Sequence, residues 1–184
     1  MPKLSPRRAR ARRPAPAPPA VRLRALERAD LPRSLAWVND PEITRFTGTL
    51  YPVSAAEEEA WYERLQNDPA QRIFALEIEG GLHVGNGGFR DIQPVPRKAE
   101  LWIYIGDRSR QQSGVGTAAI RELVKFGFER MNLHRIWVRV FAYNERALKA
   151  FEKCGFTREG LLRDDVFRDG RFHDTHVLSV LESR

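Results

Sequence analysis

The stretch from Asp107 to Ala119, DRSRQQSGVGTAA, most constrains the fold of this 184-residue chain. It follows Glu100–Ile105, a run of β-branched and aromatic residues that predicts a strand. It leads into residues 116–130, where apolar residues recur at helical spacing. Gly114 and Gly116 let a ligand approach the backbone closely, and the free N–H groups of a helix N-terminus favour an anion. We therefore expect a strand, a glycine turn and a helix that bind a pyrophosphate-containing ligand.

Two other interpretations fit the same glycines. A pair of glycines before a helix is often only a loop. The spacing Gly114-x-Gly116-x-x-Ala119 also fits a dinucleotide-binding motif, which requires an acidic residue about 20 positions later. The next predicted strand, residues 135–141, is followed by Ala-Tyr-Asn and ends without an acid. We therefore rank the dinucleotide interpretation low.

Composition restricts the class of protein. The length fits one domain with a sizeable core, and 42% hydrophobic with 30% charged residues is typical of a soluble globular protein. No apolar run is long enough to span a membrane, so we expect no membrane partner. A single cysteine, Cys154, excludes an internal disulfide and fits a reducing cytoplasm, where we expect the protein to be located. One cysteine and four scattered histidines have no metal-ligand spacing, so we expect no metal.

The formal net charge of +7 is concentrated at the N-terminus. Residues 1–20 carry six basic residues and no acid, together with alternating Pro and Ala, and predict a disordered tail before a domain at 21–184. Such a tail attracts any polyanion without specificity, so we favour a solvated extension or a misassigned start over a nucleic-acid-binding arm. The composition is also compatible with an organelle transit peptide. The nearly neutral remainder argues against specific nucleic-acid binding.

Hydrophobic periodicity predicts seven strands and four helices in the order β α α β β β α β α β β. This order indicates an α/β (α+β) protein with helices packed on a mixed sheet. We expect Asp30 to cap the first helix, and Ser54 with Glu57 to form the capping box of the second. Between them, residues 43–53 are expected to form a loop. Its Phe46 and Tyr51, with Trp61 of the second helix, are candidates for a pocket wall, an alternative to core packing that we leave open.

Glycines mark the turns and close contacts of the predicted sheet. Gly80-Gly81 and Asp169-Gly170 predict hairpin turns. Three further glycines lie within one predicted strand, and they indicate bulges or close approach of neighbouring backbone. They are Gly85, Gly87 and Gly88.

Five motifs follow one another in the second half of the chain. They are Gln111-x-x-Gly114-x-Gly116-Thr117, residues 133–136 (LHRI), 140–147 (VFAYNERA), 151–156 (FEKCGF) and 167–174 (FRDGRFHD). In this order and spacing they resemble the GNAT acetyltransferase superfamily, and within it the RimJ/RimL-like, ribosomal-protein-alanine-type N-acetyltransferases. The resemblance covers roughly residues 21–182. It implies the GNAT fold, a mixed and mostly antiparallel central sheet with a splayed central strand pair and flanking helices.

The resemblance implies acetyl-CoA as the co-substrate. Its pyrophosphate would lie on backbone N–H groups from Gln112 to Thr117, and its pantetheine arm would pair with the strand backbone near Ile103 and Ile105. Asn144 and the helix after it would contact the same arm. The full set of expected cofactor-binding residues is Ile103, Ile105, Gln111, Gln112, Ser113, Gly114, Val115, Gly116, Thr117, Asn144, Ala147, Phe151 and Lys153.

Acetyl transfer to an amine requires a neutral nucleophile, whereas an alkylamine with a pKa of ~10.4 is mostly protonated at neutral pH. The best candidate for the general base is Glu100, which begins the strand expected to hold the cofactor; its other interpretation is an exposed strand carboxylate. Many GNAT members protonate the leaving thiolate with a tyrosine at the position of Phe151, and phenylalanine cannot do so. Tyr143, Tyr104 and Cys154 are conceivable donors, and unassisted departure of the thiolate is an alternative.

The acceptor is not determined by these motifs. We expect direct transfer in a ternary complex to a primary amine, either a protein N-terminus or a small molecule, by a monomer or homodimer. The alternative is a catalytically weak acyl-CoA-binding sensor, which Phe151 keeps open. His173, Asp174 and His176 are assigned to the outer face of the last strand rather than to the acceptor site, and a catalytic Cys-His-Asp set with Cys154 is ranked low.

Overall fold

The computed structural model describes residues 19–183. Nearly all of the tail at 1–20 lies outside the described residues, and the division at residue 20 stays a prediction. Within the described part the strands form one seven-stranded sheet in the order β1-β2-β3-β4-β5-β7-β6. The strands are β1 (Val21–Ala25), β2 (Arg72–Ile78), β3 (Leu82–Gln93), β4 (Lys98–Ile105), β5 (Arg135–Phe141), β6 (Thr157–Arg168) and β7 (Arg171–Leu181).

Four predicted helices are present, and a fifth short one was missed. The helices are α1 (Leu31–Val38), α2 (Pro41–Thr44), α3 (Ala55–Asn67), α4 (Val115–Glu129) and α5 (Glu145–Glu152), with 3-10 turns at Arg28–Asp30 and Arg108–Arg110. The missed helix α2 begins inside the Asn-Asp-Pro sequence that was expected only to end α1. Pro41 is favourable at its first position, and the Asp40 side chain accepts a hydrogen bond from the Glu42 N–H at 2.9 Å. The predicted loop at 43–53 therefore starts one helical turn later.

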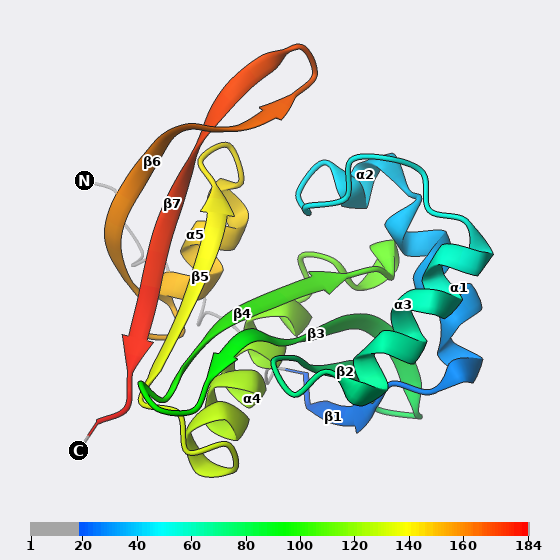
Figure 1. Cartoon of the computed structure of the whole chain (residues 1–184), viewed down its shortest axis with the longest axis horizontal. Coiled ribbons are helices and arrows are strands. Elements are labelled where there is room, and N and C mark those ends of the chain that lie inside the picture. Colours follow the sequence, from blue (N-terminus) through cyan, green and yellow to red (C-terminus); the bar gives the residue numbers. More distant parts are fainter. Residues whose placement is uncertain (1–18, 184) are drawn as a thin grey trace, which may run out of the picture.

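The sheet splits between β4 and β5. These two strands are parallel and are paired at three positions, Lys98 with Arg135, Ala99 with Ile136, and Glu100 with Trp137. Beyond Glu100 they diverge, and Figure 1 shows them opening from a shared base like the arms of a V. The other strand pairs are antiparallel. This arrangement confirms the expected mixed, mostly antiparallel sheet with a splayed central pair.

Helix α4 holds the two arms together from one face of the sheet. It packs on β1 and β4 and against α5. Its Leu123 is fully buried in one core cluster with Phe89 of β3 and Ile136 of β5. Each such side chain contributes about 1.5–3 kcal/mol when removed from water. Gly127 brings the helix close to the strands, since a Cβ there would lie 2.7 Å from Ile136 Cδ1. The core therefore keeps the base of the V rigid while its arms remain apart.

The glycines of β3 are required by close backbone approach, as the sequence predicted. A Cβ on Gly85 would lie 2.2 Å from the carbonyl oxygen of Tyr104, and one on Gly88 would lie 2.1 Å from that of Arg72. Both distances are shorter than any carbon–oxygen contact can be, and both neighbours are backbone atoms that cannot rotate away. Larger residues at these two positions would force β3 apart from β4 or β2.

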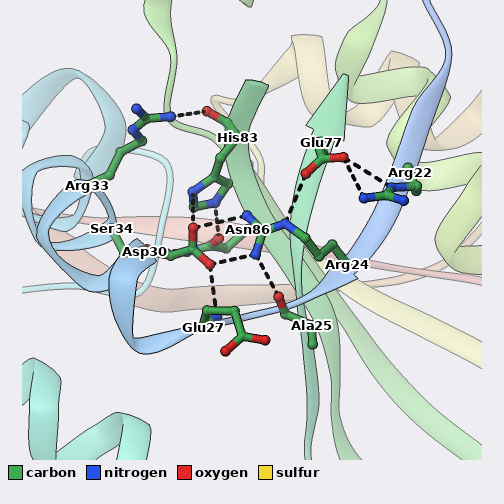
Figure 2. Close-up of polar contacts among 10 residues, drawn as sticks. All are labelled: Arg22, Arg24, Ala25, Glu27, Asp30, Arg33, Ser34, Glu77, His83 and Asn86. Atoms are coloured by element: carbon green, nitrogen blue, oxygen red, sulfur yellow. Dashed lines mark hydrogen bonds and ion pairs between the residues drawn. The ribbon is translucent and has the colours of Figure 1, made fainter. Parts of the chain in front are cut away.

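Asp30 does not cap α1 in the expected way. The chain enters α1 through the 3-10 turn, so Asp30 already has helical dihedrals and makes no side-chain cap bond to α1. Its carboxylate instead accepts hydrogen bonds from the Glu27 N–H at 2.9 Å and from Arg24 at 2.8 and 3.0 Å, as Figure 2 shows. The neighbouring Asn86 accepts from or donates to His83 Nε2 at 2.7 Å through its Oδ1 and donates to Ser34 at 2.8 Å. These buried contacts fasten α1 to β1 and β3.

Candidate active site

A cavity of about 400 Å³ lies in the opening between β4 and α5. Most of the residues predicted to bind the cofactor line it, although they come from three separate segments of the chain. They are Ile103, Ile105, Gln111, Gln112, Gly114, Gly116, Thr117, Asn144, Ala147, Phe151 and Lys153. The two exceptions are Val115, which is 2% exposed and packs in the core, and Ser113, whose hydroxyl donates to the Arg110 carbonyl.

The loop before α4 presents backbone N–H groups to this cavity. Gly114 has a φ of 88°, in the left-handed region that favours glycine, and it occupies the N-cap position of the helix. Gln111 supports the loop by donating from Nε2 to the Ile105 carbonyl at 3.0 Å. The first N–H groups of the 15-residue helix α4 have no partner within the helix, so its N-terminus is suited to an anion.

Basic side chains of α5 complete the wall of this cavity. Arg146 and Lys149 line it together with Lys153. The sequence analysis missed the first two, because charges on a short helix are usually a solvated face. Their spacing of three and four residues was the available signal, since it places all three on one side of a helix. Three cations beside a helix N-terminus fit a ligand with several phosphate groups.

A second cavity of about 770 Å³ meets the first at the splay. Ile103 and Tyr104 of β4, together with Phe151 of α5, line both cavities. A ligand in the smaller cavity therefore reaches the larger one without crossing a wall. Phe46 and Trp61 line the larger cavity, as one alternative in the sequence analysis proposed, whereas Tyr51 does not and is 79% exposed.

Glu100 lies in the larger cavity at the base of the V. It is 3% exposed and accepts hydrogen bonds from Arg90 at 2.9 and 2.8 Å and from Arg139 at 3.1 and 3.4 Å. Burial opposes its negative charge, but the two guanidinium groups outweigh burial and hold the pKa of Glu100 below its ordinary value. A carboxylate with a lowered pKa stays charged and takes up a proton weakly. Its role as general base stays a prediction.

The candidates for protonating the leaving thiolate are all engaged with other groups. Tyr143 donates to the Arg45 carbonyl at 2.7 Å, the Tyr104 hydroxyl accepts from Asn86 at 2.8 Å, and Cys154 donates to the Thr117 carbonyl at 3.5 Å. Burial is the largest influence on each of the three and raises its pKa. Tyr104 is the one of the three that lines the cavities. Phe151 is 3% exposed and packs edge-on against Phe156.

The last strand does not contribute its histidines to either cavity. His173 packs against the ring of Tyr143 with centroids 4.8 Å apart, and Asp174 accepts from the Asp164 N–H at 3.0 Å. Across residues 19–183, no three His, Cys, Asp or Glu side chains are grouped so as to hold a metal ion. No helix in the described part of the chain is long and apolar enough to cross a membrane.

The fold and the paired cavities define an acyltransferase of the GNAT type. The acetyltransferase (GNAT) domain family matches residues 20–157, and the chain belongs to that family. It is an N-acetyltransferase that uses acetyl-CoA as its co-substrate.

Characterised relatives differ in their acceptors. The spermidine N(1)-acetyltransferase of Vibrio cholerae is 31% identical over 88% of this chain and 93% of its own length. A crystal structure of the Vibrio cholerae enzyme in complex with CoA and spermine has a TM-score of 0.83, with 31% identity over 88% of this chain and 95% of that one. The L-amino acid N-acetyltransferase of Escherichia coli is 29% identical over 76% of this chain and 84% of its own length.

These comparisons correct two narrower expectations. The superfamily is confirmed, but the most similar relatives are spermidine acetyltransferases rather than ribosomal-protein-alanine acetyltransferases. Another structure of the Vibrio cholerae enzyme, with 30% identity over 88% of this chain and 93% of that one and a TM-score of 0.73, is described as dodecameric. That assembly is larger than the monomer or homodimer expected here. Motifs around the cofactor cavity are shared across the superfamily, so they carried no information on either point.

Proposed function

We propose that this enzyme acetylates a primary amine of a small aliphatic polyamine, of the spermidine and spermine class. The observation that carries the proposal is the larger cavity, which opens directly onto the cofactor cavity and has carboxylates and aromatic rings in its wall. The carboxylates are Glu57, Glu58, Glu100 and Asp165, and the rings include those of Trp61 and Trp102. Two of the three guanidinium groups in the same wall bind Glu100. The similarity to spermidine acetyltransferases supports the same substrate class.

The smaller cavity is the proposed acetyl-CoA site. Its pyrophosphate would lie on the backbone N–H groups from Gln112 to Thr117, beside the basic side chains of α5. The pantetheine arm would follow the edge of β4 near Ile103 and Ile105, which β5 leaves unpaired beyond Glu100. The thioester would then reach the region that the two cavities share, with its carbonyl polarised by β4 backbone N–H groups.

The proposed reaction is direct transfer within a ternary complex. The acceptor ammonium loses a proton, and the neutral amine attacks the thioester carbonyl. The C–N bond forms as the C–S bond breaks, and CoA leaves as a thiolate that is then protonated. The first proton must pass to a group of the larger cavity, for which Glu100 is the candidate from the sequence. Departure without a dedicated acid is tolerable, because a free thiol has a pKa of ~8.5.

Thiol release tests this function directly. The enzyme is incubated with acetyl-CoA and, separately, with spermidine, spermine, L-amino acids and peptides with free N-termini. We expect CoA release that depends on the polyamine, with a singly acetylated product identified by mass spectrometry. Acetyl-CoA binding in calorimetry without CoA release for any amine would instead support the sensor alternative. Preference for peptides would contradict the proposed acceptor class.

We also propose that the chain assembles beyond a dimer. The hairpin of β6 and β7 forms one edge of the sheet, and Figure 1 shows its tip projecting past the other strands. Several of its large apolar side chains are 41–61% exposed, an arrangement typical of a contact surface. They are Leu161, Leu162, Phe167 and Phe172.

A further inference from the structure

Glu58 occupies a position where an apolar residue is expected. Helix α3 points Glu58, Trp61 and Leu65 toward the protein at intervals of three and four residues, which is the inward stripe of an amphipathic helix. Glu58 is only 6% exposed and is the most buried side chain of this helix. Carboxylates are rarely buried to this extent without a partner. The sequence analysis recognised the two apolar members of the stripe but not the acid between the cap and Trp61.

The Glu58 carboxylate has no partner among residues 19–183. It makes no hydrogen bond or ion pair with a described side chain, and burial is the one influence that acts on its ionisation, raising its pKa. Its neighbours on the same helix behave differently: Glu57 accepts from the Ser54 N–H at 2.8 Å, and Glu63 pairs with Arg28 at the surface. Glu58 therefore carries the cost of burial with no compensating contact inside the described protein.

The side chain faces the larger cavity rather than a sealed core. Glu58 lines that cavity beside Trp61 and close to Tyr104, whose pKa its charge helps to raise. Tyr104 also lines the cofactor cavity, so Glu58 lies near the region where both cavities meet. The other charged groups in the wall are Glu57, Arg64, Arg90, Glu100, Arg139 and Asp165.

None of those charged groups compensates Glu58. Both Arg90 and Arg139 are bound to Glu100, and Arg64 and Asp165 are exposed to water. An ammonium group entering the cavity would meet one buried carboxylate without a counter-ion, with the faces of aromatic rings nearby. Carboxylates and aromatic faces are the protein groups that attract alkylammonium ions most strongly.

We propose that Glu58 binds the ammonium group of the acceptor amine and takes its proton before acetyl transfer. The N–H bond of the ammonium breaks, the proton forms an O–H bond with Glu58, and the amine lone pair attacks the thioester carbonyl. The second amine proton leaves with the tetrahedral intermediate and reaches the departing thiolate, so the products are the N-acetyl amine, CoA and a proton released from Glu58. This inference rests on the proposed function and assigns the proton to Glu58 in place of Glu100.

The chemistry predicts a specific change in pH dependence. A reaction that needs ionised Glu58 and a protonated amine has a bell-shaped profile of kcat/KM, falling on the alkaline side near the amine pKa. Without the carboxylate, the neutral form of the amine must bind from solution. The profile of the Glu58→Gln enzyme should then rise continuously toward the amine pKa, ~10.4 for an alkylamine.

The experiment compares Glu58→Gln with Glu63→Gln, a carboxylate on the same helix that lines neither cavity. With spermidine at pH 7 we expect kcat/KM to fall about 100- to 10,000-fold in Glu58→Gln, with unchanged acetyl-CoA affinity, and to change less than about twofold in Glu63→Gln. The profile should lose its bell shape only in Glu58→Gln. A retained bell in Glu58→Gln, with a lost bell in Glu100→Gln, would return the role to Glu100 and overturn the proposal.

A measurement without acetyl-CoA separates this inference from the proposed function. Spermidine alone should raise the melting temperature of the wild-type and Glu63→Gln proteins but not of Glu58→Gln. An equal increase in all three overturns the inference even if turnover is observed. Absence of an increase in the wild-type protein overturns it as well. Since Gln removes a buried charge without a partner, Glu58→Gln should fold at least as stably as the wild type; Glu58→Asp, which keeps the charge, provides a second variant with intermediate activity.

Discussion

At the scale of single residues, Glu100 joins three strands where the sheet splits. Arg90 of β3 and Arg139 of β5 reach it from either side of β4. The carboxylate is buried, whereas its two partners are 45% and 44% exposed, so water screens part of the attraction. The contact therefore links the two arms of the V at the position where backbone pairing between them ends.

This ion pair predicts a pH-dependent loss of stability in Glu100→Gln. A carboxyl with a lowered pKa in the folded state contributes stability above its ordinary pKa of about 4.5, and the contribution is lost as the pH falls from there through the lowered value. We expect Glu100→Gln to reduce the free energy of unfolding by about 1–3 kcal/mol at pH 7, or roughly 2–12 °C in melting temperature. The difference from the wild type should shrink below about pH 4.5.

Thermal unfolding followed by circular dichroism from pH 3 to pH 8 measures this difference. Glu152→Gln is a matched control, because Glu152 pairs with Arg158 at the surface and should change stability by less than about 0.5 kcal/mol. A difference between wild type and Glu100→Gln that stays constant with pH would show that the ion pair is not its source.

At the scale of elements, α5 combines a buried side with a charged one. Leu148 and Phe151 are buried in the core, and the opposite side presents basic groups to the cofactor cavity. The Asn144 side chain begins the helix by accepting from the Ala147 N–H at 3.2 Å, and Gly155 ends it with a φ of 88°. The two caps set where the helix starts and stops, and so they place its charges beside the loop that precedes α4.

Removing two of these charges should weaken CoA binding and its salt dependence together. Lys149 and Lys153 are exposed, so each is expected to contribute about 0.5–1 kcal/mol at low ionic strength. The double variant Lys149→Ala, Lys153→Ala should raise the Kd for CoA roughly 5- to 30-fold. Calorimetric titrations at two salt concentrations should show a smaller salt effect than in the wild type. Lys125→Ala, on a surface away from both cavities, should leave Kd unchanged; an equal effect from Lys125 would contradict a local role for α5.

At the scale of the whole molecule, the hairpin of β6 and β7 extends from the body as an apolar edge. The rings of Phe167 and Phe172 lie side by side at its tip, with centroids 5.0 Å apart. They are 54% and 61% exposed, respectively. Such rings would be covered if the hairpin contacted another copy of the chain.

Native mass spectrometry tests the proposed assembly. We expect the wild-type protein to form species larger than a dimer, and the double variant Phe167→Ser, Phe172→Ser to shift toward smaller species. Val95→Ser provides the control, because Val95 is equally apolar and 92% exposed but lies in the turn between β3 and β4. A wild-type protein that remains monomeric at micromolar concentration would contradict the proposal.

The sequence by itself determined the features that depend on neighbours along the chain. Hydrophobic periodicity predicted the order of strands and long helices, and Ser54 with Glu57 forms the predicted capping box. The Asp169-Gly170 turn has the positive φ values that its residues favour. Glycines at 114 and 116 indicated where the backbone faces a ligand. Local conformational preferences are sufficient for each of these, because the residues that set them are adjacent in sequence.

Only the tertiary structure decided how the charges are paired. Glu100 was located correctly on its strand, but the two arginines that lower its pKa come from positions 10 and 39 residues away in the sequence. The burial of Glu58 likewise depends on how α3 packs against the sheet, and the shared region of the two cavities exists because β4 and β5 diverge. Burial and ion pairing arise from contacts between distant segments, so periodicity and motifs have no access to them. The acceptor chemistry proposed here rests on those contacts.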